Sequence, residues 1–165
     1  MRYVKVRSRD VANGPGLRVS VWISGCSRHC KGCFNQELAN FNAGKIFTPD
    51  KMQKFAMLGI KNKEIVGFSI LGGEPLEQNK DEMIELLNTI KHPKKTIWMW
   101  TGYTYEELTP EQLEVVKLVD VLVDGPFIEE KKNYKLKFRG SSNQRIIDIN
   151  STMKTNKVTT SAIFS

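Results

Sequence analysis

Short runs of apolar, β-prone residues alternate along the chain with segments of helical periodicity. Between the apolar runs, Thr48-Pro49-Asp50 marks a helix start, and residues 77–91 carry an apolar face that ends at His92-Pro93. Capping boxes mark two further helix starts, at 104–107 and 109–112. Five runs predict strands, at residues 19–24, 66–71, 96–100, 119–123 and 145–149. Their nearly continuous apolar character favours strands covered on both faces, as in a parallel sheet, and the alternation predicts an α/β fold with right-handed crossovers.

The length of the chain limits its domain organisation. At 165 residues it has room for one domain, and it is too short for a complete eight-fold β/α barrel of about 250 residues. Residues 151–165 include seven Ser or Thr and no acid, and their periodicity is weak. We therefore expect a domain over residues 1–150 and a loosely held or partner-contacting tail over 151–165.

The charge is strongly basic, with 25 Lys and Arg against 18 Asp and Glu and a net charge of +7. Five of the cations lie between Lys131 and Arg139 with no acid among them, which indicates a solvated face or a surface that steers an acidic partner. No recognised nucleic-acid motif surrounds them, which disfavours nucleic acid as a partner. No apolar run reaches the roughly 18 residues of a membrane span, and the start lacks a signal-peptide core, so we expect a cytoplasmic protein.

Small, polar turns directly follow four of the predicted strands. They lie at residues 24–26, 72–75, 101–103 and 124–127. If the strands are parallel, these turns share one edge of the sheet, which is where α/β proteins bind ligands. Any single turn of this kind is explained by backbone needs alone, but four together, one of them leading into all the cysteines, favour a functional site.

The three cysteines form one loop, Cys26, Cys30 and Cys33, with C-x₃-C-x₂-C spacing. Clustered thiolates suit zinc or an iron–sulfur cluster. A four-iron cluster is normally held by four cysteines, so three leave one iron open to an exogenous ligand. The alternative is a zinc site with His29 as the fourth ligand, although the spacing departs from the usual C-x₂-C pairs.

Several motifs together resemble a known group of enzymes. The cysteine loop with Phe34, and Gly72-Gly73-Glu74-Pro75, resemble the two signatures of the radical S-adenosylmethionine superfamily. Asn13-Gly14-Pro15-Gly16-Leu17-Arg18 is similar to a segment of the glycyl-radical-enzyme activases. Within that group, four further segments resemble the activators of anaerobic ribonucleoside-triphosphate reductase, at residues 33–35, 98–103, 123–127 and 139–144. The resemblance extends from about residue 3 to residue 149.

The resemblance implies a fold, two cofactors and a reaction. The fold is a partial, open β/α barrel of about five or six mostly parallel strands. Cys26, Cys30 and Cys33 hold a 4Fe-4S cluster, and S-adenosylmethionine binds its open iron and is reductively cleaved. The resulting radical abstracts hydrogen from a backbone glycine of the partner, the large subunit of the anaerobic reductase. A low-potential electron donor is a second implied partner.

The same resemblance assigns cofactor contacts, with no catalytic residue beyond the cluster ligands. Gly72 and Gly73 offer backbone groups to the methionine ammonium, and Glu74 adds a negative charge for it. The other candidates are Gly32 and Phe34 for the adenine, Arg18 for a carboxylate, and Asp124 as either a polar contact or a helix cap. Residues 139–144 either hold a ribose or carboxylate or simply connect two elements.

Two other functions are compatible with the sequence. One is a different small radical enzyme, either the activase of another glycyl-radical protein or an enzyme that modifies a small molecule. The other is a non-catalytic zinc module, with Cys26, Cys30, Cys33 and His29 as ligands, which binds RNA through its basic surface.

Overall fold

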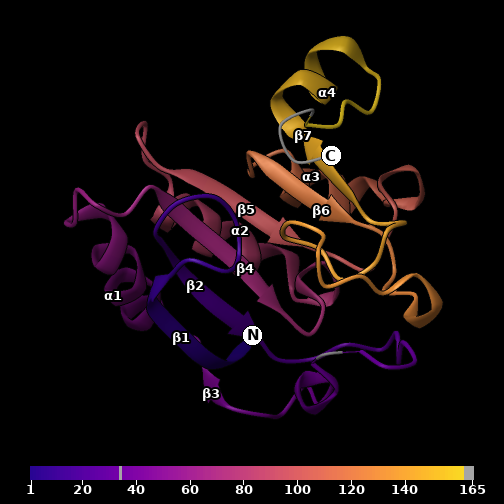
Figure 1. Cartoon of the computed structure of the whole chain (residues 1–165). Coiled ribbons are helices and arrows are strands. Elements are labelled where there is room, and N and C mark those ends of the chain that lie inside the picture. Colours follow the sequence, from indigo (N-terminus) through magenta and orange to yellow (C-terminus); the bar gives the residue numbers. More distant parts are fainter. Residues whose placement is uncertain (34, 162–165) are drawn as a thin grey trace.

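The structure is a computed structural model that describes residues 1–33 and 35–161. These residues form an α/β fold with four α-helices and a mixed seven-stranded sheet (Figure 1). The strands are β1 (Arg2–Asp10), β2 (Arg18–Ile23), β3 (Lys45–Ile46), β4 (Gly67–Gly72), β5 (Thr96–Trp100), β6 (Val121–Asp124) and β7 (Arg145–Asp148). The helices are α1 (Pro49–Ile60), α2 (Lys80–Ile90), α3 (Pro110–Val116) and α4 (Ile149–Thr155). Short 3₁₀ turns are η1 (Gln36–Leu38), η2 (Pro75–Glu77), η3 (Tyr105–Glu107) and η4 (Glu129–Lys131).

The centre of the sheet is parallel and its edges are antiparallel. The strand order is β3-β1-β2-β4-β5-β6-β7, in which β2, β4, β5 and β6 run parallel to their neighbours. β1 and β3 extend one edge in antiparallel pairs, and β7 pairs antiparallel with β6 at the other. Among the described strands the sheet is therefore open, and β3 and β7 form its two edges.

This topology corrects part of the predicted fold. The α/β class is confirmed, but seven strands replace the expected five or six, and the strand at 145–149 is antiparallel rather than parallel. β1 carries Lys5, Arg7 and Arg9 among its nine residues, and much of its surface is exposed, so no apolar run predicts it. It is stabilised by pairing with β2, which is a tertiary effect that local sequence does not record.

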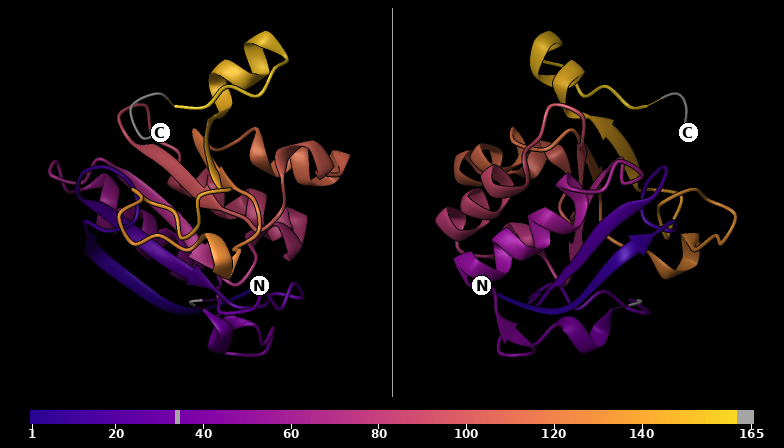
Figure 2. Two further views of the ribbon diagram at one scale, coloured as in Figure 1. Left: turned by 45° about the vertical axis from the view of Figure 1, so that its right-hand side comes forward. Right: turned by 90° about the vertical axis from the view of Figure 1, so that its left-hand side faces the viewer.

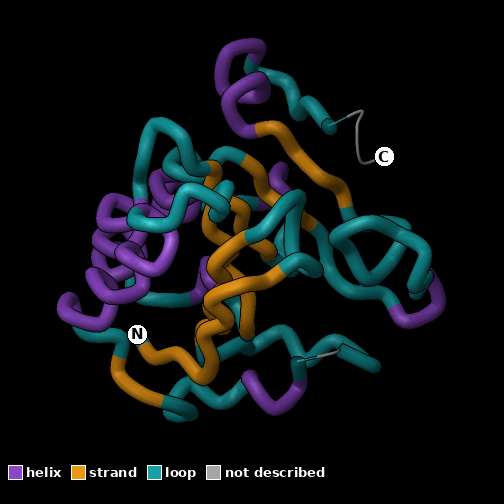
Figure 3. Tube along the Cα trace, turned by 60° about the vertical axis from the view of Figure 1, so that its left-hand side comes forward, coloured by secondary structure: helices purple, strands orange, loops and turns teal. Residues whose placement is uncertain are grey.

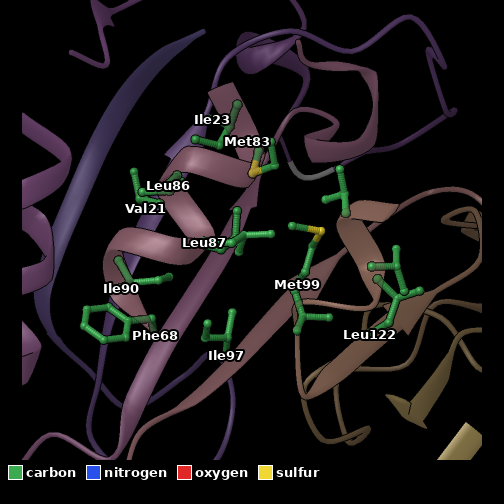
Figure 4. Close-up of a cluster of buried hydrophobic side chains, with 14 of the residues drawn as sticks. Val21, Ile23, Phe68, Met83, Leu86, Leu87, Ile90, Ile97, Met99 and Leu122 are labelled. Carbon is green, nitrogen blue, oxygen red and sulfur yellow. The ribbon is translucent and has the colours of Figure 1, made fainter. Parts of the chain in front are cut away.

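Helices α1, α2 and α3 lie together on one side of the sheet (Figure 2). Caps fix their starts, because Thr48, Asn79 and Thr109 each accept a hydrogen bond from a main-chain N–H in the first turn. The main core lies between these helices and alternate residues of the strands (Figure 4); among its members are Val21, Ile23, Phe68, Met83, Leu86, Leu87, Ile90, Ile97, Met99 and Leu122.

Within the described residues, no layer of helices covers the opposite side of the parallel strands, here called the open face. Its residues alternate with those of the core: Ser20 and Trp22 on β2, Ser69 and Leu71 on β4, and Trp98 and Trp100 on β5. The predicted coverage of both faces is seen in the burial of β2, β4 and β5, although α1, α2 and α3 all lie on the other side of the sheet. Small hydroxyl side chains and three tryptophans form this side, and Ser20, Ser69 and Trp98 on it are buried. Figure 3 shows the course of the strands and of the loops around them.

The chain after β7 is more regular than the sequence suggests. Asp148 caps α4 by accepting a hydrogen bond from the Ser151 N–H, and Ile149 and Thr152 are buried. Beyond the helix, the Asp148 N–H donates to the Thr159 carbonyl and the Ser161 N–H donates to the Ile146 carbonyl. Hydrogen bonds at Thr159 and Ser161 thus connect the segment after α4 to β7. Within the described residues, no helix has the length and apolar character that a membrane crossing requires.

Candidate functional site

A cleft of about 780 Å³ lies at the carboxyl ends of the four parallel strands. All four of the turns that follow these strands line it, as the sequence predicts for one shared edge. Trp22, Leu71 and Trp100 continue the lining along the open face. From the turns it is lined by Cys26, Arg28, His29, Cys30, Lys31, Gly32 and Cys33, by Gly72, Gly73 and Glu74, by Thr101 and Gly102, and by Gly125 and Phe127.

The cysteine loop leaves β2 and folds back beside the cleft. The Gly25 and Cys26 N–H groups donate to the carbonyls of Leu38 and Ala39, at 2.7 and 3.0 Å, which ties the start of the loop to the segment after it. His29 and Gly32 are left-handed, with φ of +49° and +71°, and so turn the chain twice within the loop.

Cys26, Cys30 and Cys33 are half-buried, carry free thiols and all line the cleft. Burial raises the pKa of the Cys26 thiol, and the carboxylates of Glu74 and Glu77 act in the same direction. Among the described residues, no three His, Cys, Asp or Glu side chains are grouped to bind one metal ion. Three unpaired thiols facing one cleft are the donor chemistry of an iron–sulfur cluster, whose irons are bound by separate thiolates, so this donor set fits such a cluster.

Glycine is required at two positions of the turn after β4, because the main chain of this turn lies close to the main chain at the end of β2. Gly72 has φ of +127°, and a Cβ there would lie 2.1 Å from the Ile23 carbonyl oxygen. A Cβ on Gly73 would lie 2.4 Å from the Gly25 carbonyl oxygen. Hydrogen bonds from the Gly73 N–H to Ile23 and from the Glu74 N–H to Gly25 fix this turn against the start of the cysteine loop. The two predicted signatures are thus packed directly on each other.

Glu74 lines the cleft, but its carboxylate is engaged within the protein. It is 1% exposed and accepts hydrogen bonds from the Gly102 N–H at 2.7 Å, the Thr101 hydroxyl at 2.8 Å and the Leu76 N–H at 3.0 Å. Burial raises the pKa of Glu74 to about 7, against the opposing effect of these three bonds. Glu74 therefore links the turn after β4 to the turn after β5.

Two residues expected to contact a cofactor do not line the cleft. Arg18 is fully buried at the amino end of β2, and its N–H groups donate to the side chains of Ser69 and Thr96 and to the carbonyls of Pro15, Phe68 and Thr96. Its guanidinium lies 5.7 Å from the Trp98 ring, and burial lowers its pKa to about 10. With every N–H donor engaged inside the protein, Arg18 braces the start of β2 against β4 and β5, and its contact with a carboxylate stays a prediction.

Asp124 is likewise engaged in a buried ion pair. Its carboxylate accepts hydrogen bonds from the Arg145 guanidinium at 2.5 and 3.0 Å and from the Tyr105 N–H at 2.8 Å. Arg145 also binds Glu106 on the surface, and these two carboxylates raise its pKa. Asp124 therefore joins β6 to β7 and accepts a hydrogen bond from the first N–H of η3, while its role as a polar contact at the site stays a prediction.

Of the remaining predicted residues, Gly32 lines the cleft, and Phe34 lies outside the described residues. Asn13 also reaches the cleft, although its side-chain amide donates to Asp10 at 2.7 Å. In the segment 139–144, Gln144 accepts hydrogen bonds from the N–H groups of Gly140 and Ser141, at 2.9 and 3.0 Å, and thereby closes the loop. This segment forms a wall of the cleft through Arg139, Gly140 and Gln144.

Sequence reasoning missed several lining residues. Trp22 and Trp100 enter the cleft because they alternate with the core residues Val21 and Met99, a period-two signal that a continuous apolar run conceals. Arg28 lies 4.6 Å from the Tyr103 ring and 3.7 Å from Glu107. The only sequence signal that pointed to Arg28 was its position within the cysteine loop.

An α/β chain with three free thiols in one loop, at the ligand-binding edge of its sheet, has the character of an iron–sulfur protein. The family model described as "4Fe-4S single cluster domain" matches residues 12–147, which include the whole parallel sheet and the cysteine loop. The chain is accordingly an iron–sulfur, metal-binding protein of the 4Fe-4S type.

Curated relatives define the family further. The chain is 41% identical over 148 residues to the anaerobic ribonucleoside-triphosphate reductase-activating protein of Salmonella typhi, covering 87% of this chain and 96% of the relative. The protein of that name from Escherichia coli (strain K12) is 40% identical over 149 residues, with the same coverages. That of Enterobacteria phage T4 is 38% identical over 149 residues, or 88% of this chain and 93% of the relative. The chain belongs to the family of anaerobic ribonucleoside-triphosphate reductase-activating proteins.

Proposed function

We propose that this protein is a radical S-adenosylmethionine activase that generates a glycyl radical on the large subunit of an anaerobic ribonucleoside-triphosphate reductase. The observation that carries the proposal is the convergence of three free thiols and the Gly72-Gly73 turn on one cleft. The names of the relatives support the choice of partner.

Cys26, Cys30 and Cys33 would hold the 4Fe-4S cluster, since each thiolate binds one iron and one iron is left for S-adenosylmethionine. When both groups are bound and a low-potential donor supplies an electron, they provide cleavage of the sulfonium C–S bond to methionine and a 5′-deoxyadenosyl radical. The protein itself positions the reactants and excludes water.

The lining of the cleft suits these tasks. The Gly72-Gly73 turn brings main chain to the cleft without side chains, so an ammonium group could approach its backbone closely. The Gly72 carbonyl already accepts a hydrogen bond from the Asn35 side-chain amide at 3.2 Å. Gly32 lines the cleft beside the last cysteine and is the candidate contact for the adenine. Trp22, Leu71 and Trp100 provide an apolar wall that keeps water from the reacting atoms.

The fold gives a protein substrate access to this site. We interpret the open sheet as the partial barrel of the radical S-adenosylmethionine superfamily, in which the lack of closure leaves the side of the cleft accessible. A glycine-bearing segment of the reductase would then enter beside the strands and not through the ring of turns. We expect the reaction to take place in the cytoplasm.

Anaerobic reconstitution with iron and sulfide, followed by assays of 5′-deoxyadenosine release and of the glycyl radical by electron spin resonance, tests the proposal. Cys30→Ala is expected to lose cluster assembly and S-adenosylmethionine cleavage together, because a thiolate ligand is removed. Ser27→Ala is the matched control in the same loop, since this exposed side chain donates its hydroxyl to Glu77 and does not line the cleft.

The alternatives predict different results. Full cleavage activity in Cys30→Ala would show that the ligand assignment is wrong. A colourless protein that contains one zinc and binds RNA would identify the zinc module. Cleavage of S-adenosylmethionine with a glycyl radical on another protein, or with a modified small molecule, would identify a different radical enzyme.

A further inference from the structure

The segment between β6 and β7 builds one wall of the cleft and extends beyond it into solvent. Asn133, Tyr134, Leu136 and Phe138 line the cleft. The part that projects is here called the basic tip; it consists of Lys131, Lys132, Tyr134, Lys135 and Lys137. All five of these residues are exposed, so the tip adds little to the stability of the fold and its composition requires another explanation.

The tip is exposed, yet both ends of it are held in place. The Ser142 N–H donates to the Lys131 carbonyl at 2.9 Å, and the Asn133 N–H donates to the Gly140 carbonyl at 3.2 Å. On the side facing the sheet, the Trp100 indole N–H donates to the Phe138 carbonyl at 2.8 Å, and the Phe138 ring packs edge-on against Trp98. A surface fixed in this way loses little conformational entropy on binding, which favours recognition of a partner.

The chemistry of the tip combines an aromatic ring with concentrated positive charge. Tyr134 is 81% exposed, the highest value among the large apolar side chains of the described residues, and the Lys132 ammonium lies 4.7 Å from its ring centre. From Lys131 to Arg139 five cations occur with no acid. Exposed tyrosines are frequent anchors of protein interfaces, and a basic surface attracts an acidic one before contact.

We propose that the basic tip docks an acidic patch on the surface of the protein that this chain activates. The inference rests on the proposed function and adds to it the chemistry of the partner surface. Tyr134 contributes to both the tip and the wall of the cleft, so the two form one continuous surface. A protein that inserts a segment into the cleft must lie against the tip, whereas a nucleic acid has no such reason to approach it.

The test compares two double variants of the reconstituted holoprotein. Lys132→Glu with Lys135→Glu reverses two charges of the tip, and neither side chain lines the cleft. The control variant, Lys63→Glu with Lys94→Glu, makes the same change in net charge. Both residues lie in exposed turns that precede β4 and β5, at the amino ends of these strands and therefore opposite the end where the cleft lies. All four substituted lysines are exposed, and circular dichroism is used to check that both double variants are folded.

Binding to the anaerobic reductase is measured by biolayer interferometry at two salt concentrations. The tip variant is expected to raise Kd by about tenfold and to reduce its salt dependence, while the control changes Kd by less than about twofold. Tyr134→Ala, which keeps the charge, is expected to weaken binding about fivefold through loss of the aromatic anchor. Release of 5′-deoxyadenosine without the reductase is expected to be equal in the wild type and the tip variant.

The two proposals fail in different ways. Equal reductase binding by the tip and control variants, or no binding by the wild type, overturns the docking proposal. Loss of RNA binding in the tip variant with reductase binding unchanged also overturns it, in favour of a nucleic-acid surface. Absence of 5′-deoxyadenosine release from the wild type overturns the proposed function instead.

Discussion

Replacing Glu74 by Gln removes an ionisable group from the most deeply buried carboxylate of the cleft lining. The wild-type side chain is 1% exposed, and burial raises its pKa from the ordinary 4.5 to about 7. Between these two values the folded chain keeps the proton and the unfolded chain has lost it. The stability of the wild type is therefore expected to fall as the pH rises through this window.

The size of the effect follows from the two pKa values. A pKa raised from 4.5 to about 7 makes ionisation about 3 kcal/mol more costly in the folded protein than in the unfolded chain. About 2 kcal/mol of this develops between pH 5 and pH 8. The glutamine side chain of the variant does not titrate. Its amide NH2 group cannot accept a hydrogen bond, so at least one of the three bonds to the wild-type carboxylate is lost, which costs about 1 kcal/mol at every pH. Relative to the wild type, Glu74→Gln thus gains stability as the pH rises.

Urea denaturation of reduced, metal-free protein at several values from pH 5 to pH 8 measures this difference. Since both proteins are measured at each pH, contributions of other titrating groups cancel. A difference that stays constant within about 0.5 kcal/mol, or that favours the wild type at high pH, would refute the reasoning.

Three other substitutions test the scaffold by the same denaturation assay at pH 7. Gly14→Ala is expected to cost about 1 to 3 kcal/mol, because φ at Gly14 is +102° and a Cβ would lie 2.9 Å from Arg18 Cδ; an unchanged midpoint would contradict this close packing. Arg145→Met is expected to cost about 3 kcal/mol, since it leaves the buried Asp124 carboxylate without its cation. Glu106→Gln, at the surface end of the same network, is expected to cost less than about 1 kcal/mol, and equal losses in the two variants would exclude this explanation.

The predictable parts of the fold are those that local sequence encodes. The four parallel strands are buried, and their apolar runs locate them. The caps at Thr48 and Thr109 correctly mark the starts of α1 and α3. The rule that the carboxyl ends of parallel strands meet at one edge of a sheet correctly predicted that the four turns lie together. Because one of these turns leads into the cysteine loop, the same rule predicted that all three cysteines lie beside one cleft.

Elements that depend on distant pairing were beyond local reasoning. β1 alternates charged and apolar residues without a clean period and becomes a strand through its partner β2. The antiparallel direction of β7 depends on the long segment before it, which returns along the cleft instead of crossing the sheet as a helix. α4 follows a single capping residue, Asp148, in a region whose composition is typical of a loose tail.

Three of the predicted site residues share one physical feature, which is burial with their donors or acceptors engaged inside the protein. Arg18, Glu74 and Asp124 each carry charge in a motif, and a charge in a motif suggests contact with a ligand. Their N–H groups or carboxylate oxygens instead bind neighbouring turns and strands of the protein. Loss of activity on mutation of any of them therefore does not identify a cofactor contact. Only a measurement that separates folding from cofactor affinity can do so, whereas for the three thiols, which line the cleft as free groups, loss of the cluster is the direct readout.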